Sequence, residues 1–176
     1  MQFHASRLAG AFLIEPDRHV DDRGFFARIY CEKDFAARGL QTRFVQSSVA
    51  FNAHRGTLRG MHWQVGDDAE VKLVRVTRGS AFDVIVDLRS DSPTYLQWES
   101  FTLSAENHAT LYIPRGFAHG YLTLSDDNEF SYQMSAFYNP SAGRGARYDD
   151  PAFKILWPEA PVHIHDRDRN YADYQA

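Results

Sequence analysis

The chain has 176 residues, of which 44% are hydrophobic, 24% charged and 14% aromatic, a composition typical of one globular domain and not of a disordered chain. Its net charge of −4 and pI near 6.0 argue against nucleic acid or an anionic membrane surface as the main partner. Cys31 is the only cysteine, which excludes an intrachain disulfide and fits the reducing cytoplasm, where we expect the protein. The N-terminus lacks the apolar core of a signal peptide, and no apolar run has the length of a membrane span.

Taken in chain order, the predicted elements are mostly strands. Residues 1–14 read as one β-strand that Pro16 ends, and residues 32–40 predict a short helix closed by Gly39. β-Rich segments follow at residues 44–51, 58–64, 71–78, 81–88, 97–103, 108–113, 117–124 and 129–137. Many short strands separated by turns predict an all-β protein, a sandwich or a small barrel. Residues 140–176 form an irregular tail with several prolines.

The stretch from Gly56 to Gln64 combines glycines, an arginine and a histidine. If its second half is extended, His62 and Gln64 share one face of the strand, while Met61 and Trp63 take the other. A polar inner face is typical of a β-barrel or sandwich that holds a ligand. The alternative is an ordinary half-buried strand with one satisfied histidine, and the stretch alone leaves both open.

A lysine and an aspartate stand among apolar residues on consecutive strands. Lys72 has the same strand parity as Val74 and Val76, so its amine either enters a polar cavity or extends outward from an edge strand. The tight turn at Gly79 is expected to make the two flanking strands neighbours. Asp83, on the second of them, is therefore expected to pair with Lys72.

A second histidine, His119, follows a Pro-x-Gly turn in the segment Pro114–Gly120. This segment resembles the second motif of the cupin superfamily, which implies a jelly roll, or double-stranded β-helix. In metal-binding cupins the corresponding histidine is a ligand, and the first motif carries His-x-His. Here that first motif falls on His62-Trp63-Gln64, and an amide oxygen is a poor replacement for imidazole toward iron, zinc or manganese. We therefore expect no metal.

Three further residues are candidates for substrate contacts. Tyr132 and Tyr138 have the same parity, and six residues of strand span roughly 20 Å, about the length of a nucleotide-diphosphate sugar. One tyrosine would lie at the sugar and the other stack on the base, although each alone reads as an ordinary sheet tyrosine. Asp168 lies in a charged run that is usually solvated. It matters only if the tail folds back over the cavity.

Taken together, the chain closely resembles the dTDP-4-dehydrorhamnose 3,5-epimerases, a family of the cupin superfamily. No single motif is decisive, but the set is specific and runs through nearly the whole chain in order. The matching segments are Asp22–Phe26, Arg59–Gln64, Lys72–Val74, Asp83–Arg89, Ser92–Thr94, Pro114–Gly120, Tyr132 with Tyr138, Asp149–Pro151, Ile155–Pro158 and Asp166–Asp168.

The resemblance implies epimerisation of a nucleotide-linked 4-keto-6-deoxy sugar without a metal, nicotinamide or flavin. It implies His62 as general base with Asp168 as its partner, Tyr132 as general acid and Lys72 as the cation for an enolate oxygen. The substrate-binding positions that it implies are Arg23, Gln46, Arg59, Asp83, His119, Tyr138 and Arg167. It also implies a single domain over residues 1–176, dimerised by exchange of residues 1–14, with the tail 140–176 closing the site.

The chain departs from the family pattern at Arg28, Ser48, Ala50 and His165, all at substrate-contact or flanking positions. These departures predict an altered substrate scope with the catalytic residues retained. Three alternatives stay open. The first is a metal-dependent cupin enzyme using His62 and His119, and the second is a non-catalytic protein that binds sugar nucleotides. The third is an epimerase of one centre, or a ketoisomerase, acting on another nucleotide sugar.

Overall fold

The computed structural model describes residues 1–175, and strands make up most of its regular structure. The helices are short: α1 (Glu32–Ala36), the 3₁₀ turn η1 (Gly66–Asp68) and α2 (Asp166–Arg169). The strands are β1 (Gln2–Ala5), β2 (Phe12–Glu15), β3 (Arg18–Asp21), β4 (Gly24–Ala27), β5 (Gln46–Asn52), β6 (Thr57–Gln64), β7 (Lys72–Arg78), β8 (Ser80–Asp87), β9 (Trp98–Ser104), β10 (Thr110–Ile113), β11 (Phe117–Thr123), β12 (Asn128–Met134), β13 (Gly143–Gly145) and β14 (His163–Ile164). Within residues 1–175, no helix is long and apolar enough to cross a membrane.

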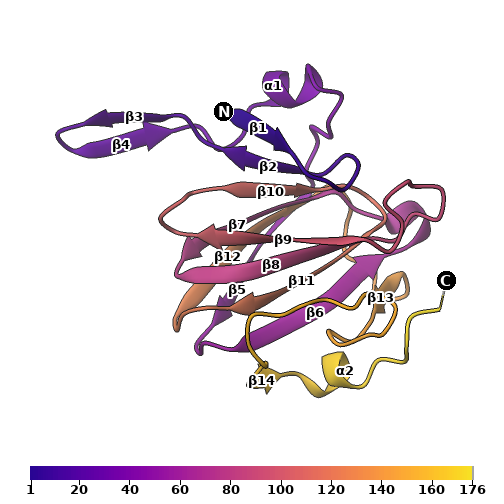
Figure 1. The fold of residues 1–176 in the computed structure, drawn as a ribbon. Coiled ribbons are helices and arrows are strands. Elements are labelled where there is room, and N and C mark those ends of the chain that lie inside the picture. The colour runs from indigo at the N-terminus through magenta and orange to yellow at the C-terminus, as the bar shows by residue number, and fades with distance from the viewer. Residues whose placement is uncertain (176) are drawn as a thin grey trace.

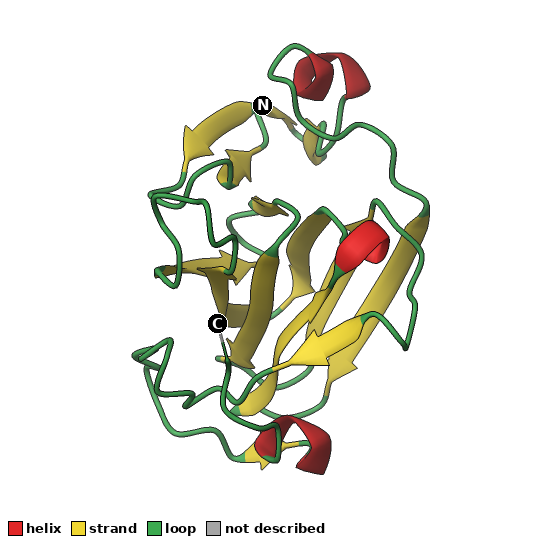
Figure 2. Cartoon of the chain, turned by 90° about the vertical axis from the view of Figure 1, so that its right-hand side faces the viewer, coloured by secondary structure: helices red, strands yellow, loops and turns green. Residues whose placement is uncertain are grey.

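The strands form two six-stranded sheets that pack face to face, as expected of a jelly roll (Figure 1). The first sheet has the order β1-β2-β10-β7-β12-β5. The second has the order β13-β6-β11-β8-β9, with β14 added in parallel to β6. A separate hairpin of β3 and β4 projects beyond the sandwich (Figure 1). The short helices lie around the strands (Figure 2), and the predicted all-β class is confirmed.

The two strands that flank Gly79 lie in different sheets, so the expectation that they are neighbours is wrong. β7 pairs with β10 and β12, whereas β8 pairs with β9 and β11. Gly79 adopts φ +76°, and the backbone of Ser80 is held by the side chains of Ser125 (3.0 Å) and Asn128 (2.9 Å). These bonds direct the chain across the sandwich instead of back along the same sheet.

The N-terminal region also differs from its prediction, because residues 1–14 form two strands and not one. The chain turns between Ser6 and Ala11, whose backbone groups form a 3.0 Å hydrogen bond. Leu8 in this turn is buried in the core between the sheets, which fixes the turn in place. β1 then pairs with β2, and β2 with β10, at the edge of the first sheet.

The inward-facing rows of the sheets change from apolar to polar along the strands. On β7, Val76 and Val74 belong to the buried core, and Lys72 continues the same row into a cavity. On β12, Phe130 lies in that core and Tyr132 extends from it to the cavity. One end of the sandwich is therefore a packed core, and the other end is hollow and polar.

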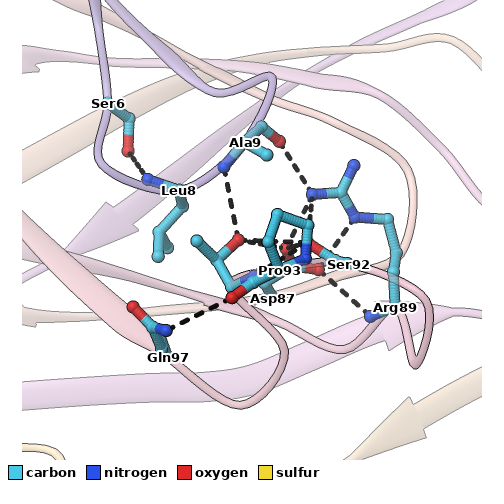
Figure 3. Close-up of polar contacts among 9 residues, drawn as sticks. Ser6, Leu8, Ala9, Asp87, Arg89, Ser92, Pro93 and Gln97 are labelled. Carbon is cyan, nitrogen blue, oxygen red and sulfur yellow. Dashed lines mark hydrogen bonds and ion pairs between the residues drawn. The ribbon is translucent and has the colours of Figure 1, made fainter.

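A buried carboxylate holds the loop after β8 to the N-terminal turn (Figure 3). Asp87 is fully buried and accepts hydrogen bonds from Arg89 (2.6 and 2.8 Å), Ser92 (2.5 Å) and Thr94 (2.7 Å). Arg89 also donates to the carbonyl of Ala9 (2.7 Å), which ties the two segments together. Burial opposes ionisation of Asp87, yet the hydrogen bonds outweigh it and hold its pKa at about 2.

We expect Asp87→Asn to lower the free energy of unfolding by about 2 kcal/mol at pH 7. Because the pKa of Asp87 falls from 3.8 to about 2 on folding, the carboxylate stabilises the fold above pH 4. This contribution disappears as the pH falls from about 4 to about 2. Urea denaturation across this range measures it, with Asp91→Asn, an exposed carboxylate of the same loop, as control. A difference between Asp87→Asn and wild type that stayed constant with pH would contradict the assignment.

Candidate active site

The hollow end of the sandwich contains a cavity of about 560 Å³. Its walls come from both sheets and from the segment after β12, and the C-terminal tail contributes Arg167 and Tyr171. The predicted site residues that line it are Gln46, Arg59, His62, Lys72, His119, Tyr132, Tyr138 and Arg167. Residues more than a hundred positions apart in the sequence thus share one space.

The imidazole of His62 is paired with the carboxylate of Asp168. Nε2 of His62 lies 2.8 Å from Oδ1 of Asp168, while Oδ2 accepts a hydrogen bond of 3.2 Å from the backbone N–H of Gly60. β6 supplies His62, and the short helix α2 supplies Asp168, which is buried. His165 caps α2 by accepting a bond of 3.1 Å from the backbone N–H of Arg167. The tail therefore folds back, and this brings the carboxylate of Asp168 to His62 on β6.

The ionisation of Asp168 decides how His62 is oriented. Burial raises the pKa of this carboxyl, but the bonds from His62, Gly60 and Arg167 outweigh burial and hold it below its usual range. An ionised carboxylate only accepts hydrogen bonds, so Nε2 of His62 carries the proton. The lone pair is then on Nδ1, which leaves this nitrogen available to take up a proton.

A second histidine–carboxylate pair lies next to the first. His119 on β11 pairs in register with His62 on β6, and its Nε2 lies 3.0 and 2.9 Å from the two carboxylate oxygens of Asp83. Both partners are buried, and burial raises the pKa of the Asp83 carboxyl in spite of the opposing effect of His119. The pair places the imidazole of His119 in the cavity wall with Asp83 behind it.

Lys72 reaches the cavity, but its predicted pairing with Asp83 is wrong. Its ammonium lies 3.0 Å from a carboxylate oxygen of Glu70 and donates weakly to the carbonyl of His62 at 3.4 Å. The reason is topological, because β7 and β8 belong to opposite sheets and Asp83 is already engaged by His119. The side chain of Lys72 is mostly buried, so its charge faces the cavity and not bulk water.

Tyr132 enters the cavity from β12, in the sheet opposite to the one that carries His62. Its ring lies 6.1 Å from the ring of His119 in an edge-on arrangement. Burial, and after it the neighbouring Tyr121 and Asp83, raise the pKa of Tyr132 well above that of an ordinary tyrosine. The phenol is therefore protonated at neutral pH and can serve as a proton donor.

The strand that carries Tyr132 ends at Met134, so Tyr138 does not lie on the same ladder, contrary to the prediction. Instead, the backbone N–H of Tyr138 donates to the side chain of Gln46 (2.6 Å), and the residue is 65% exposed. Gln64 holds the adjoining loop, accepting from the backbone of Asn139 (2.6 Å) and donating to the carbonyl of Phe137 (3.2 Å). These bonds bend the chain and bring Tyr138 to the rim of the cavity.

Of the three arginines predicted to bind the substrate, two line the cavity and one lies outside it. Arg59 and Arg167 line the cavity, and Nε of Arg167 lies 3.2 Å from Asp168. Arg23 instead lies at the turn of the β3–β4 hairpin with its side chain 89% exposed and paired with Asp21. The chain by itself therefore brings Arg23 to no part of the cavity wall. Arg28, just after β4, lines a small separate hollow near Met1.

Tyr171 is a cavity residue that the sequence did not indicate. Its ring lies 6.2 Å from that of His62 and packs directly over Gly145. A Cβ atom at position 145 would come within 2.2 Å of the ring, so the bare glycine backbone is needed for this contact. The backbone carbonyl of Tyr171 accepts a bond of 3.2 Å from Arg147. Because the tail has no regular periodicity, no pattern marks this position in advance.

Similarity to known proteins agrees with this geometry. The family described as dTDP-4-dehydrorhamnose 3,5-epimerase matches residues 5–176. The chain belongs to this family. It is 45% identical over 170 residues to the dTDP-4-dehydrorhamnose 3,5-epimerase of Pseudomonas aeruginosa, covering 94% of this chain and 92% of that one.

Two solved epimerase structures resemble this family member closely. The dTDP-4-dehydrorhamnose 3,5-epimerase of Bacillus anthracis, with TDP and PPi bound, has a TM-score of 0.94 and 38% identity, and the match covers 98% and 99% of the two chains. The dTDP-6-deoxy-D-glucose-3,5-epimerase of Legionella pneumophila, in complex with dTDP-4-keto-L-rhamnose, has a TM-score of 0.89 and 36% identity, covering 96% and 89%. The family and the jelly-roll fold predicted from the sequence are confirmed.

The side chains at the cupin metal-ligand positions of this epimerase-family cavity are already hydrogen-bonded to other groups of the protein. His62 is held by Asp168 and His119 by Asp83, while both ends of the Gln64 amide bond to neighbouring loops. In the described part of the chain, no group of three or more histidine, cysteine, aspartate or glutamate side chains is placed to hold a metal ion. The arrangement is suited to moving protons between side chains and a bound organic substrate.

Proposed function

We propose that the protein inverts a carbon centre next to the ketone of a nucleotide-linked 4-keto-6-deoxy sugar. The observation that carries this proposal is the placement of a histidine–carboxylate pair and a tyrosine on opposite walls of one cavity. His62 with its partner Asp168 lies on the second sheet, and the protonated Tyr132 lies on the first. Removing a proton from one face of a carbon and returning one to the other face inverts that centre.

The proposed reaction begins with removal of a proton beside the ketone by Nδ1 of His62. The C–H electrons move into the adjacent C–C bond, and the carbonyl electrons move to oxygen, which gives an enolate. The ammonium of Lys72, largely shielded from water and facing the cavity, stabilises the oxygen as its charge develops. Asp168 stabilises the imidazolium that forms on His62.

The second step returns a proton from the opposite wall. The enolate carbon takes the phenolic proton of Tyr132, the ketone re-forms, and Tyr132 is left as tyrosinate. Proton exchange with water then restores both His62 and Tyr132. The number of electrons on the substrate is the same before and after, so the residues of this chain suffice for the step and no redox partner enters it.

The remaining cavity residues suit a nucleotide diphosphate. Arg59 and Arg167 offer guanidinium groups for the phosphate oxygens, which accept paired hydrogen bonds from arginine. Tyr138 at the rim presents an exposed ring on which a base can stack. The Legionella epimerase structure holds dTDP-4-keto-L-rhamnose, a nucleotide-linked 4-keto sugar of the class proposed here as the substrate.

The test of the proposed function is conversion of dTDP-4-keto-6-deoxyglucose by protein purified without added metal, before and after treatment with a chelator. We expect epimerised product and an unchanged rate after chelation. A metal-dependent cupin enzyme using His62 and His119 would lose activity on chelation and regain it with one metal. A binding protein without catalytic activity would bind the substrate but release it unchanged.

We expect weaker discrimination between dTDP- and UDP-linked substrates than is usual in the family. Ser48 and Ala50 line the cavity wall on β5, where the family pattern has asparagine and serine, so the wall offers fewer hydrogen bonds. An unpaired substrate donor or acceptor costs on the order of 1–3 kcal/mol. The measurement is kcat/KM for both nucleotides with wild type and Ser48→Asn. A strong wild-type preference for dTDP that Ser48→Asn leaves unchanged would contradict it.

We further propose that the protein is a homodimer. The β3–β4 hairpin projects from the sandwich with Val20 76% and Phe26 71% exposed, and such an apolar hairpin is suited to pairing with a second copy. The exposed Arg23 at its tip would then approach the partner's cavity. Light scattering at micromolar concentration should give the dimer mass. Val20→Asp with Phe26→Asp should give the monomer, whereas Leu156→Asp, 77% exposed in the tail, should not. A monomeric wild type would contradict the proposal.

A further inference from the structure

Glu70 lines the cavity but has no part in the reaction steps proposed above. It comes two residues before Lys72 at the start of β7, so in an extended chain the two side chains face the same side. Val71 between them is buried in a different packing cluster, and its backbone N–H donates to the side chain of Ser135 (2.8 Å). This alternation directs Glu70 and Lys72 together into the cavity.

The carboxylate of Glu70 is held at both of its oxygens. Oε1 lies 3.0 Å from the ammonium of Lys72, and Oε2 accepts a hydrogen bond from the amide nitrogen of Gln64. That nitrogen also donates to the carbonyl of Asp68 (2.9 Å), and the amide oxygen accepts from the backbone N–H of Asn139 (2.6 Å). Because a backbone N–H only donates, the Gln64 amide must turn its oxygen to Asn139 and its nitrogen to Glu70. The orientation of Glu70 is therefore fixed from behind.

The ammonium of Lys72 is held in turn by Glu70. The side chain of Lys72 is 14% exposed and that of Glu70 7%, so water screens the attraction between the two charges only weakly. Within residues 1–175, the polar contacts of this ammonium are the ion pair with Glu70 and a weak hydrogen bond of 3.4 Å to the backbone carbonyl of His62. An ammonium carries three donors, so it keeps hydrogen-bonding capacity for a bound substrate.

We propose that Glu70, oriented by Gln64, is a positioning residue that keeps the ammonium of Lys72 beside His62. The flexible stem of a lysine lets its ammonium range widely, and the carboxylate of Glu70 fixes it at one side of the cavity. There it meets the oxygen on which charge develops when His62 removes the substrate proton. This role rests on the proposed function, in which Lys72 stabilises the enolate. Glu70 acts on the substrate through Lys72.

Glu70→Gln should lower kcat about 10-fold with KM little changed, because a neutral amide of the same shape no longer attracts the ammonium. Removal of the substrate proton, read as deuterium uptake in deuterated water, should slow by the same factor as inversion, since the enolate precedes both. Asp67→Asn, which removes an exposed carboxylate three residues earlier, should behave as wild type. Wild-type kcat in Glu70→Gln, or slow inversion with fast exchange, would overturn the proposal.

Glu70→Asp separates the position of the carboxylate from its charge. It keeps the charge but withdraws it from Lys72 by one C–C bond, about 1.5 Å, and a displacement of about 1 Å can cost on the order of 10²-fold in rate. We therefore expect a loss of kcat at least as large as in Glu70→Gln. A full rate in Glu70→Asp would show that Glu70 only neutralises Lys72, and the positioning role would fail.

Gln64→Leu removes the donor that holds Oε2 of Glu70. kcat should fall, and KM should rise as well, because Gln64 also holds the loop that carries Tyr138. A wild-type kcat in Gln64→Leu would contradict the orienting role of Gln64.

Two double-mutant cycles with Lys72→Met test whether Glu70 acts through Lys72. In turnover, Glu70→Gln should cause no further loss of kcat in the Lys72→Met background, and a second 10-fold loss there would overturn the proposal. The unfolding cycle needs no substrate. Each single variant should lower the urea midpoint, because one member of a buried ion pair is left alone, and the double variant should lower it by less than the sum. Additive losses would contradict the ion pair.

The outcomes separate this inference from the proposed function. If wild type epimerises the substrate and no Glu70 variant loses rate, the inference fails and the proposed function stands. If wild type epimerises nothing, the proposed function fails and the positioning role falls with it, even where the unfolding cycle shows the ion pair.

Discussion

Replacing His62 by alanine should lower kcat by about 10²- to 10⁴-fold while the nucleotide still binds. The imidazole is the group in the cavity whose tautomer is set by an ionised carboxylate, at 2.8 Å from Asp168. Without it, the base of the proposed mechanism is missing, whereas Arg59 and Arg167 can still bind the phosphates. Steady-state kinetics together with calorimetric titration of dTDP separate the two effects.

The control for this variant is His54→Ala, which removes an exposed histidine from the loop between β5 and β6. It should turn over at the wild-type rate. Turnover of His62→Ala within a factor of a few of wild type would contradict the assignment of the base. Loss of dTDP binding in the same variant would show that His62 holds the substrate instead of reacting with it.

Tyr132→Phe should reduce inversion by a similar 10²- to 10⁴-fold while proton exchange continues. Phenylalanine preserves the stack on Phe130 but carries no proton to return. His62 still removes the substrate proton and can give it back to the same face after exchange with water. In deuterated water the variant should therefore incorporate deuterium without a change of configuration, which NMR detects directly.

The control is Tyr112→Phe, because Tyr112 is a buried tyrosine of the same sheet that belongs to a different packing cluster from Tyr132. It should invert the substrate at the wild-type rate. If Tyr132→Phe epimerises as fast as wild type, another group returns the proton and Tyr132 is not the acid. If it exchanges no deuterium at all, Tyr132 is needed already for proton removal.

The parts of the site that were predictable from the sequence rest on strand parity and on family resemblance. His62 and Gln64 do face the same side of β6, and Lys72 does continue the row of Val74 and Val76. Alternate residues of an extended strand face the same side. This holds whichever sheet the strand joins, so it can be predicted from the local sequence. The placement of His119 could also have directed attention to Tyr121, two residues further on the same face.

The parts that were not predictable depend on contacts between distant segments. The residues around Gly79 do not indicate whether the next strand pairs with β7 or crosses to the other sheet. Because that strand crosses, Lys72 forms its ion pair with Glu70, and Asp83 pairs with His119. The bend that brings Tyr138 to the rim depends on the side chains of Gln46 and Gln64, remote in sequence.

The tail illustrates the same point. Asp168 lies in a run of charges that resembles a solvated surface, and its burial follows from the return of the tail to β6 through β14 and the N–H of Gly60. Resemblance to a family predicted this residue, whereas composition did not. Neither the family resemblance nor the composition indicated Tyr171, three residues later. Its position depends on the close approach of its ring to Gly145.

The most direct test of the base and acid on opposite walls is NMR of dTDP-4-keto-6-deoxyglucose incubated with wild-type protein in deuterated water. We expect product in which every inverted centre lies next to the ketone and carries deuterium, because the proton that Tyr132 returns has exchanged with water. Inverted product that retains the original hydrogen, or a product in which the carbonyl has moved to another carbon, would contradict this account.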